Sequence, residues 1–283
     1  MGRFRWVVVI ACLSWTAPLL SFDLGGLDPL KITEILAKGV QSFGDVPEEK
    51  EIQIGRDLSA GLLGATPLVD DAEVQNYVNG IGRWLAYQTE RPKLPWTFAV
   101  IDTDTVNAFA APGGYVFVTR GLFLMLRNEA ELAGVIGHEI SHVLRRHHLV
   151  AIEKQLRASL ASDVAGMLVD YDANMVDALV GAGMELYGKG LDRDDEFEAD
   201  RMGVVVAARG GYDAYGLPAM LMTLHSRNDS DQNLTFLFST HPATEDRLGH
   251  LDKEMQGRMD QYSGAAGQTK RFQEIQKRLR GDP

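Results

Sequence analysis

Cysteine is nearly absent from this chain, because Cys12 is the only one among 283 residues. A single thiol cannot form an intramolecular disulfide, so the stability of the fold has to come from its hydrophobic core. Positive charge is also scarce: 28 lysines and arginines face 39 aspartates and glutamates, which gives a net charge of −11. An acidic chain is poorly suited to binding a phosphate backbone, so nucleic acid is not an expected partner.

Long apolar runs are missing as well. The apolar run at residues 6–13 is far shorter than the ~20 residues that a helix needs to cross a bilayer. The small-residue-rich stretch at 158–187 is interrupted by several aspartates, and each of these charges is costly in lipid. We therefore expect no transmembrane helix, and attachment to a membrane only through a lipid anchor.

Residues 1–22 are typical of an export signal, because Arg3 and Arg5 precede the apolar run. Cys12 follows Val9-Ile10-Ala11, which is similar to a bacterial lipobox, where the cysteine becomes the lipidated mature N-terminus. By resemblance to such lipoproteins, Leu13 in the next position, rather than an aspartate, would send the protein to the outer membrane. The alternative is an ordinary signal peptide in which Cys12 is one more apolar residue. The lipobox hypothesis predicts a periplasmic protein anchored to the outer membrane.

The rest of the chain shows mainly helical patterns. Hydrophobic periodicity and capping signals predict helices over residues 48–63, 71–86, 128–148, 151–169, 175–187, 193–209 and 215–225. Short strands are expected over residues 96–101, 107–111 and 115–119. Residues 252–283 form a short, charged, helical tail, and the sequence contains no internal repeat of about 20 to 50 residues. The pattern predicts an α+β fold, mostly helical, with one small β-sheet.

The strongest chemical signal is the segment His138-Glu139-Ile140-Ser141-His142. Residues four apart on a helix differ by about 40° in direction, so His138 and His142 can bind one metal ion together. Zinc accepts two imidazole nitrogens and a carboxylate and keeps a position for water. Glu139 lies about 100° around the helix, where its carboxylate can take a proton from that water. A chance match is the alternative, but these polar groups would be costly in such an apolar helix without a partner.

A third metal ligand is expected from the segment Glu196 to Asp200. Glu196 and Asp200 lie four apart and face the same way. Glu196 can bind zinc, while Asp200 accepts the free ring N–H of a histidine ligand and fixes its tautomer. Glu198 points about 200° away from Glu196 and is expected in solvent. The alternative is a charged helix start, which explains the acidity of this segment but not the spacing.

A rival zinc motif is incomplete in this chain. Metzincins need a glycine three residues after the second histidine of the motif, and Arg145 stands there. Without that glycine we expect the helix to continue, so that His148 points about 240° away from His142 and cannot reach the same metal. Arg145, Arg146 and His147 are then predicted to form a solvated helix end.

On these motifs the chain resembles the HtpX, Oma and BepA group of gluzincin metallopeptidases, most closely the exported BepA/LoiP-type members. The matching segments are, in order, Asn107-Ala108-Phe109-Ala110, Pro112-Gly113-Gly114, Val118 to Leu122, Asn128 to Ala133, Gly137 to His142, Glu196 to Asp200, and Thr240 to Arg247. The resemblance implies a zinc metallopeptidase domain over residues 45–251 with a gluzincin fold. It also implies that the strand Asn107, Ala108, Phe109, Ala110 edges the active cleft, where an extended substrate adds to it.

The resemblance further implies roles for His241 and Arg247. His241 would either take the fourth place on zinc and block the catalytic water, or stabilise the oxyanion. Because it precedes Pro242, an extended loop conformation is favoured, and a surface histidine without a function is the third alternative. Arg247 is expected to steady the oxyanion.

Taken with the resemblance, the sequence predicts a zinc-dependent endopeptidase with one Zn²⁺ per chain. The ligands are His138, His142 and Glu196, and Glu139 is the general base. The expected substrates are unfolded or misassembled cell-envelope proteins, with envelope assembly machinery as a further partner. The alternative is a chaperone-like outer-membrane assembly factor that binds exposed strands with little proteolysis. An intact Glu139 argues against a pure binder, because binding alone needs no base.

Overall fold

The computed structural model describes residues 46–162, 190–227, 244–264 and 269–281, together with Gly183, Leu237, Thr240 and His241. The predicted signal segment with Cys12 and almost all of the helix predicted over 175–187 lie outside the described residues. Among the described helices, none combines the length and the apolar character that a bilayer crossing requires.

Three strands form one small mixed sheet, in the order β1-β3-β2. The strands are β1 (Thr97–Ile101), β2 (Ala108–Ala111) and β3 (Tyr115–Thr119). Strand β3 pairs with β1 in parallel and with β2 in antiparallel orientation. Among the described strands, β2 therefore lies at one edge of the sheet, as expected of the cleft-edging strand that the family resemblance implies.

The opposite edge of the sheet is covered by side chains of helix α3 (Ala72–Tyr87). The amide of Gln75 donates to the Val100 carbonyl at 2.8 Å and accepts from the Val100 N–H at 2.9 Å. Asn79 accepts in the same way from the Phe98 N–H at 3.2 Å. These bonds satisfy backbone groups of β1 that a neighbouring strand would otherwise pair with.

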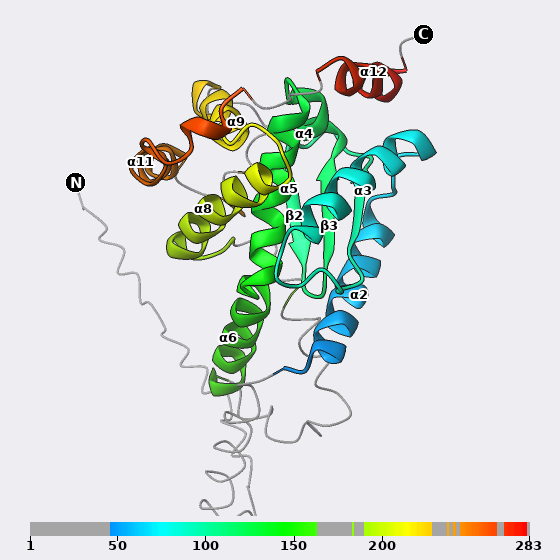
Figure 1. Cartoon of the computed structure of the whole chain (residues 1–283). Coiled ribbons are helices and arrows are strands. Elements are labelled where there is room, and N and C mark those ends of the chain that lie inside the picture. The colour runs from blue at the N-terminus through cyan, green and yellow to red at the C-terminus, as the bar shows by residue number, and fades with distance from the viewer. Residues whose placement is uncertain are drawn as a thin grey trace, which may run out of the picture.

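Helix α5 (Glu129–Leu144) lies between the sheet on one side and α8 (Arg193–Arg209) and α9 (Gly216–Ser226) on the other (Figure 1). Every residue of α5 is buried. The side chain of Asn128 caps its first turn by accepting from the Glu131 N–H at 2.9 Å, as the capping signal predicts. The segment from His138 to His142 thus lies on a fully buried central helix.

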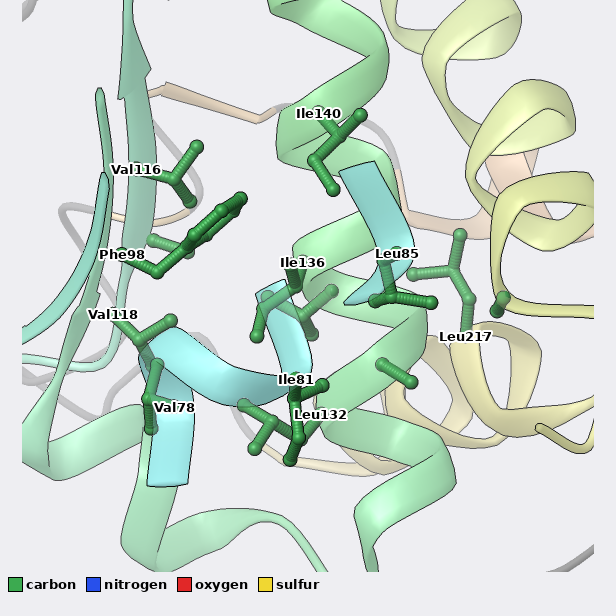
Figure 2. Packing of buried hydrophobic residues seen from close by; sticks show 14 of the residues in the cluster. Val78, Ile81, Leu85, Phe98, Val116, Val118, Leu132, Ile136, Ile140 and Leu217 are labelled. Atoms are coloured by element: carbon green, nitrogen blue, oxygen red, sulfur yellow. The ribbon is translucent and has the colours of Figure 1, made fainter. Parts of the chain in front are cut away.

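Apolar side chains fix α5 against its neighbours, as Figure 2 shows. The labelled core residues come from α3, the strands, α5 and α9: Val78, Ile81, Leu85, Phe98, Val116, Val118, Leu132, Ile136, Ile140 and Leu217. Burying one such side chain stabilises the fold by about 1.5–3 kcal/mol. The face of α5 that packs on the sheet is therefore held by several residues at once.

Small residues bring α5 and α8 into close contact. A Cβ atom on Gly137 would lie 2.7 Å from the carbonyl oxygen of Gly203, and a Cβ on Gly203 would lie 2.7 Å from the backbone nitrogen of His138. Both distances are too short for real Cβ atoms, so these positions require glycine at this separation. This close approach places the first turns of α8 beside the histidines of α5.

The remaining described helices surround this centre. They are α2 (Glu48–Ala65), α4 (Arg120–Met125), α6 (His147–Ser162), α11 (Thr244–Met255) and α12 (Thr269–Arg280), with a short 3-10 turn at Asp260–Tyr262. Helix α4 was not predicted. It follows strand β3 without a turn, because Thr119 is both the last residue of β3 and the N-cap of α4, where its hydroxyl accepts from the Leu122 N–H at 3.1 Å.

The predicted continuation of α5 to His148 is wrong. The helix ends at Leu144, and Arg146 has a φ of 57°, the one positive φ outside glycine in the described chain. The Arg146 guanidinium donates to the buried carboxylate of Glu51 at 3.0 Å and to the Val46 carbonyl at 3.2 Å. This contact with α2 holds the chain in the left-handed turn, and α6 begins afresh at His147.

Candidate metal centre

Two imidazoles of α5 converge with a carboxylate of α8. The Nε2 atoms of His138 and His142 lie 3.0 Å apart. The Glu196 carboxylate lies 3.6 Å from His138 Nε2 and 3.5 Å from His142 Nε2. All three side chains are buried. With His241 they form a group whose ligand atoms lie within 4.8 Å of one another.

The outer nitrogen of His138, Nδ1, points away from the converging group and contacts the buried ion pair of Asp200 and Arg247. Its Nδ1 lies 2.9 Å from Asp200 Oδ1, in the position that the sequence predicted for Asp200. Arg247 of α11 donates to both Asp200 oxygens, through Nε at 2.7 Å and Nη2 at 2.6 Å. Its Nη1 also lies 3.3 Å from Glu196 Oε2. Arg247 therefore contacts the candidate ligand Glu196 directly and the candidate ligand His138 through Asp200.

The outer nitrogen of His142 has a partner that the sequence did not predict. His142 Nδ1 lies 2.9 Å from Nδ1 of His147, whose side chain is only 6% exposed. His147 Nε2 in turn lies 3.3 Å from Glu198 Oε2. The prediction of a solvated His147 is wrong, and Glu198, which also pairs with Arg145 at 3.0 Å, is only one third exposed. No local sequence signal marks this contact, because it depends on the turn at Arg146.

His148 also lies closer to the centre than predicted. Its ring packs edge-on against His142, with 5.3 Å between the ring centroids, instead of pointing away on a continuous helix. Burial lowers the pKa of His148 to about 3, which keeps the ring neutral. Its nitrogens are nevertheless not among the converging ligand atoms of the described residues. The predicted direction of His148, away from His142, is therefore wrong, whereas its exclusion as a ligand stays a prediction.

His241 contacts the same carboxylates. Its Nδ1 lies 3.0 Å from both oxygens of Glu196, and its Nε2 lies 3.9 Å from Glu139 Oε1. The side chain is 7% exposed, so it is not a surface loop histidine. Its backbone N–H donates to the Leu237 carbonyl at 2.7 Å.

Burial and charge separate the two buried glutamates. Burial raises the pKa of Glu139, and the charges of His241 and His138 only partly oppose this shift. Burial alone would also raise the pKa of Glu196, but His241 and Arg247 outweigh it and bring the pKa to about 2. Burial opposes protonation of His241, yet its charge and hydrogen-bond interactions with Glu196 raise its pKa to about 9. Glu196 is therefore the permanent anion of this group.

One oxygen of Glu139 makes no hydrogen bond to any residue that the structure describes. Among the described residues, Glu139 Oε2 is buried without a hydrogen-bond partner, as is Asn107 Nδ2. A small cavity of about 20 Å³ adjoins Glu139 and His241 and is otherwise lined mainly by apolar side chains, among them Ala108 of β2. Strand β2 and the candidate base thus border the same space.

The donor set fits a metal cation. His138 and His142 both direct Nε2 inward while Nδ1 faces an outer partner, so two ring nitrogens and a carboxylate point at one region. This is the usual arrangement of zinc ligands with their outer partners. The structure thus brings together all the residues predicted as ligands, base and outer partner.

Comparison with known proteins agrees with this geometry. The signature of peptidase family M48 matches residues 72–255. A putative beta-barrel assembly-enhancing protease of Vibrio cholerae serotype O1 is 30% identical over 84% of this chain and 50% of its own length. The beta-barrel assembly-enhancing protease of Escherichia coli K12 is 33% identical, over 70% and 42%. The mitochondrial metalloendopeptidase OMA1 of Arabidopsis thaliana is 28% identical, over 79% and 42%.

The chain spans about half the length, or less, of these curated relatives. The family match, in contrast, covers more than half of the chain and includes both helices that carry the converging histidines and glutamate. This protein therefore belongs to peptidase family M48.

Proposed function

We propose that this protein is a zinc-dependent endopeptidase with one Zn²⁺ held by His138, His142 and Glu196. The observation that carries the proposal is the convergence of two inward Nε2 atoms, 3.0 Å apart, on one buried carboxylate. Two nitrogens and an oxygen suit zinc and leave a coordination place for substrate or water. Membership of a peptidase family supports the same chemistry.

The proposed reaction is hydrolysis of a peptide bond. When bound, zinc lowers the pKa of a water molecule to about 7 and polarises a carbonyl group. Glu139 accepts the proton that the attacking water loses and later donates it to the leaving amine as the C–N bond breaks. Its buried Oε2, which has no partner among the described residues, is suited to this exchange. Asp200 and Arg247 keep His138 and Glu196 in position throughout.

His241 is proposed to control access to this site. Its position among the converging ligand atoms supports a role as a fourth protein ligand, which would exclude water. Activity would then require the segment around His241 to move away, so a conformational equilibrium would set the rate. Oxyanion stabilisation by His241 stays the alternative, and the oxyanion role of Arg247 stays a prediction beside its contacts with Asp200 and Glu196.

The proposed substrates are unfolded or misassembled proteins of the cell envelope. Two relatives are named for enhancing beta-barrel assembly, and their similarity to this chain supports that substrate class and a link to envelope assembly machinery. The domain is proposed to span residues 45–251, with 252–283 as a helical tail. The proposed location is the periplasm, with an outer-membrane lipid anchor at Cys12. Mass spectrometry of the mature N-terminus would identify a lipidated Cys12 or an unmodified start further downstream.

Activity can be tested on the purified full chain with an unfolded model protein as substrate. We expect cleavage that stops with a zinc chelator and returns when Zn²⁺ is added back. No cleavage by the zinc-loaded wild-type chain or by zinc-loaded His241→Ala would contradict the proposal. The chaperone-like alternative predicts instead that the chain suppresses aggregation of the substrate and that chelation and the substitution Glu139→Gln leave this unchanged.

A further inference from the structure

We propose that His147 is a positioning residue for the metal ligand His142 and that it connects this ligand to Glu198. The inference rests on the proposed zinc site, because it concerns how one of its ligands is held. The carrying observation is a chain of contacts: His142 Nδ1 lies 2.9 Å from His147 Nδ1, and His147 Nε2 lies 3.3 Å from Glu198 Oε2.

A metal ion bound at His142 Nε2 would fix the ring-proton positions of His142 and His147. His142 directs Nε2 to the converging group, so a metal there leaves the ring proton on Nδ1. His147 must then accept that proton's hydrogen bond through its own Nδ1, which places its proton on Nε2. This Nε2–H faces Glu198 Oε2, with Asp195 Oδ1 also near at 3.6 Å. His147 in this tautomer satisfies both of its contacts, with His142 and with Glu198.

The two histidine ligands are thus held by different means. His138 contacts the buried carboxylate of Asp200 directly. His142 instead contacts the imidazole of His147. That imidazole contacts the carboxylates of Asp195 and Glu198, whose side chains are each one third exposed. A hydrogen bond to the outer nitrogen fixes the orientation of a histidine ligand and raises its basicity. We therefore expect His147 to fix the orientation of the His142 ring and to raise its basicity.

The contact between His142 and His147 depends on the backbone turn at Arg146. On a continuous helix, residues five apart differ by about 140°, so His147 would not meet His142. The left-handed turn at Arg146 changes this direction, and the buried carboxylate of Glu51 stabilises the turn by accepting from the Arg146 guanidinium at 3.0 Å. Helix α2 thus contributes, through Glu51, to the orientation of a metal ligand on α5.

Zinc affinity of the full chain provides the test. We compare His147→Leu, which removes the acceptor, with His147→Asn, whose amide oxygen can take the place of Nδ1. Competition with a chromophoric chelator measures Zn²⁺ binding, and thermal unfolding of the metal-free variants measures the fold. We expect His147→Leu to lose about 10- to 100-fold in affinity and His147→Asn to recover most of it. His225→Leu, on the exposed end of α9, is the matched control.

Equal zinc affinity of His147→Leu and wild type would overturn the inference, and so would an equal loss in both His147 variants. A wild-type chain without zinc affinity would overturn the proposed function as well, so the two failures are distinguishable. A second measurement introduces Glu198→Ala into wild type and into His147→Asn and His147→Leu. We expect it to weaken zinc binding several-fold in wild type but not with His147→Leu. The same loss in all three backgrounds would contradict the chain of contacts.

Discussion

At the scale of single residues, the two buried glutamates of the centre differ in their partners. Glu196 contacts His241 through both oxygens and Arg247 through Oε2, whereas Glu139 leaves Oε2 without a partner among the described residues. The substitution Glu139→Gln removes the proton acceptor and keeps the side-chain shape. We expect kcat to fall by about 10²- to 10⁴-fold while zinc content and unfolding temperature stay unchanged.

Turnover of an unfolded substrate and metal content of the same sample check this expectation. Exposed Glu245, at the start of α11, provides a control through Glu245→Gln, which should keep full activity. If Glu139→Gln turns over substrate at nearly the wild-type rate, Glu139 is not the base.

The role of His241 can be decided by whether His241→Ala raises or lowers the rate of proteolysis. As a fourth ligand it would exclude water from the metal, so His241→Ala should raise basal proteolysis several-fold and keep the zinc bound. As an oxyanion stabiliser it should instead lower kcat by about 10²- to 10³-fold. Initial rates of peptide cleavage, with zinc content measured in parallel, separate the two roles. An unchanged rate would exclude both.

At the scale of elements, the contact between α5 and α8 sets the distance from the histidines to Glu196. A Cβ on Gly203 would approach the backbone nitrogen of His138 to 2.7 Å, so Gly203→Ala has to push the helices apart. We expect a loss of about 1–3 kcal/mol in the free energy of unfolding, together with weaker zinc binding. Urea unfolding and chelator competition provide the two measurements.

Gly249→Ala is the matched control for this substitution. An added Cβ at Gly249, on α11, meets no atom within 4 Å, and alanine favours a helix more than glycine does. We expect unchanged or slightly higher stability and unchanged zinc affinity. Equal effects of both substitutions would show that the separation of α5 and α8 is not what Gly203 determines.

Most elements were predictable because their signals are local. The predicted start of α2, the Asn128 cap of α5, and the bounds of β3 and α8 agree with the structure, because capping residues, alternation and terminal glycines act within a few positions. The end of α5 was not predictable. No glycine marks the left-handed turn at Arg146, which depends on an ion pair with Glu51, far away in the sequence.

The same distinction applies to the residues of the site. Spacing on a helix was enough to propose His138 and His142 as partners, and Glu196 and Asp200 likewise, because each pair lies on one helix. The contact between His142 and His147 crosses the turn at Arg146, so helical geometry predicted the wrong direction. The pairing of Arg247 with Asp200 joins two helices, and only the tertiary structure shows it.

At the scale of the whole molecule, the proposed metal joins helices α5 and α8 across the core. Zinc that binds only the folded state should stabilise the chain by mass action, so the unfolding temperature should rise with free Zn²⁺ and fall with a chelator. Glu196→Gln should reduce this rise strongly, whereas Glu139→Gln should keep it. Thermal unfolding over a zinc titration checks this, and equal rises in both variants would remove Glu196 from the site.

The order of the site along the chain has a consequence for synthesis. The segment with His138, Glu139 and His142 leaves the ribosome before Glu196, and the ion-pair partner Arg247 follows later still. A nascent chain that exposes the first two proposed ligands and the base still lacks the third ligand and the groups that orient it. The proposed peptide hydrolysis therefore requires α8 and α11 to have packed against α5, so a partly synthesised or partly folded chain would lack it.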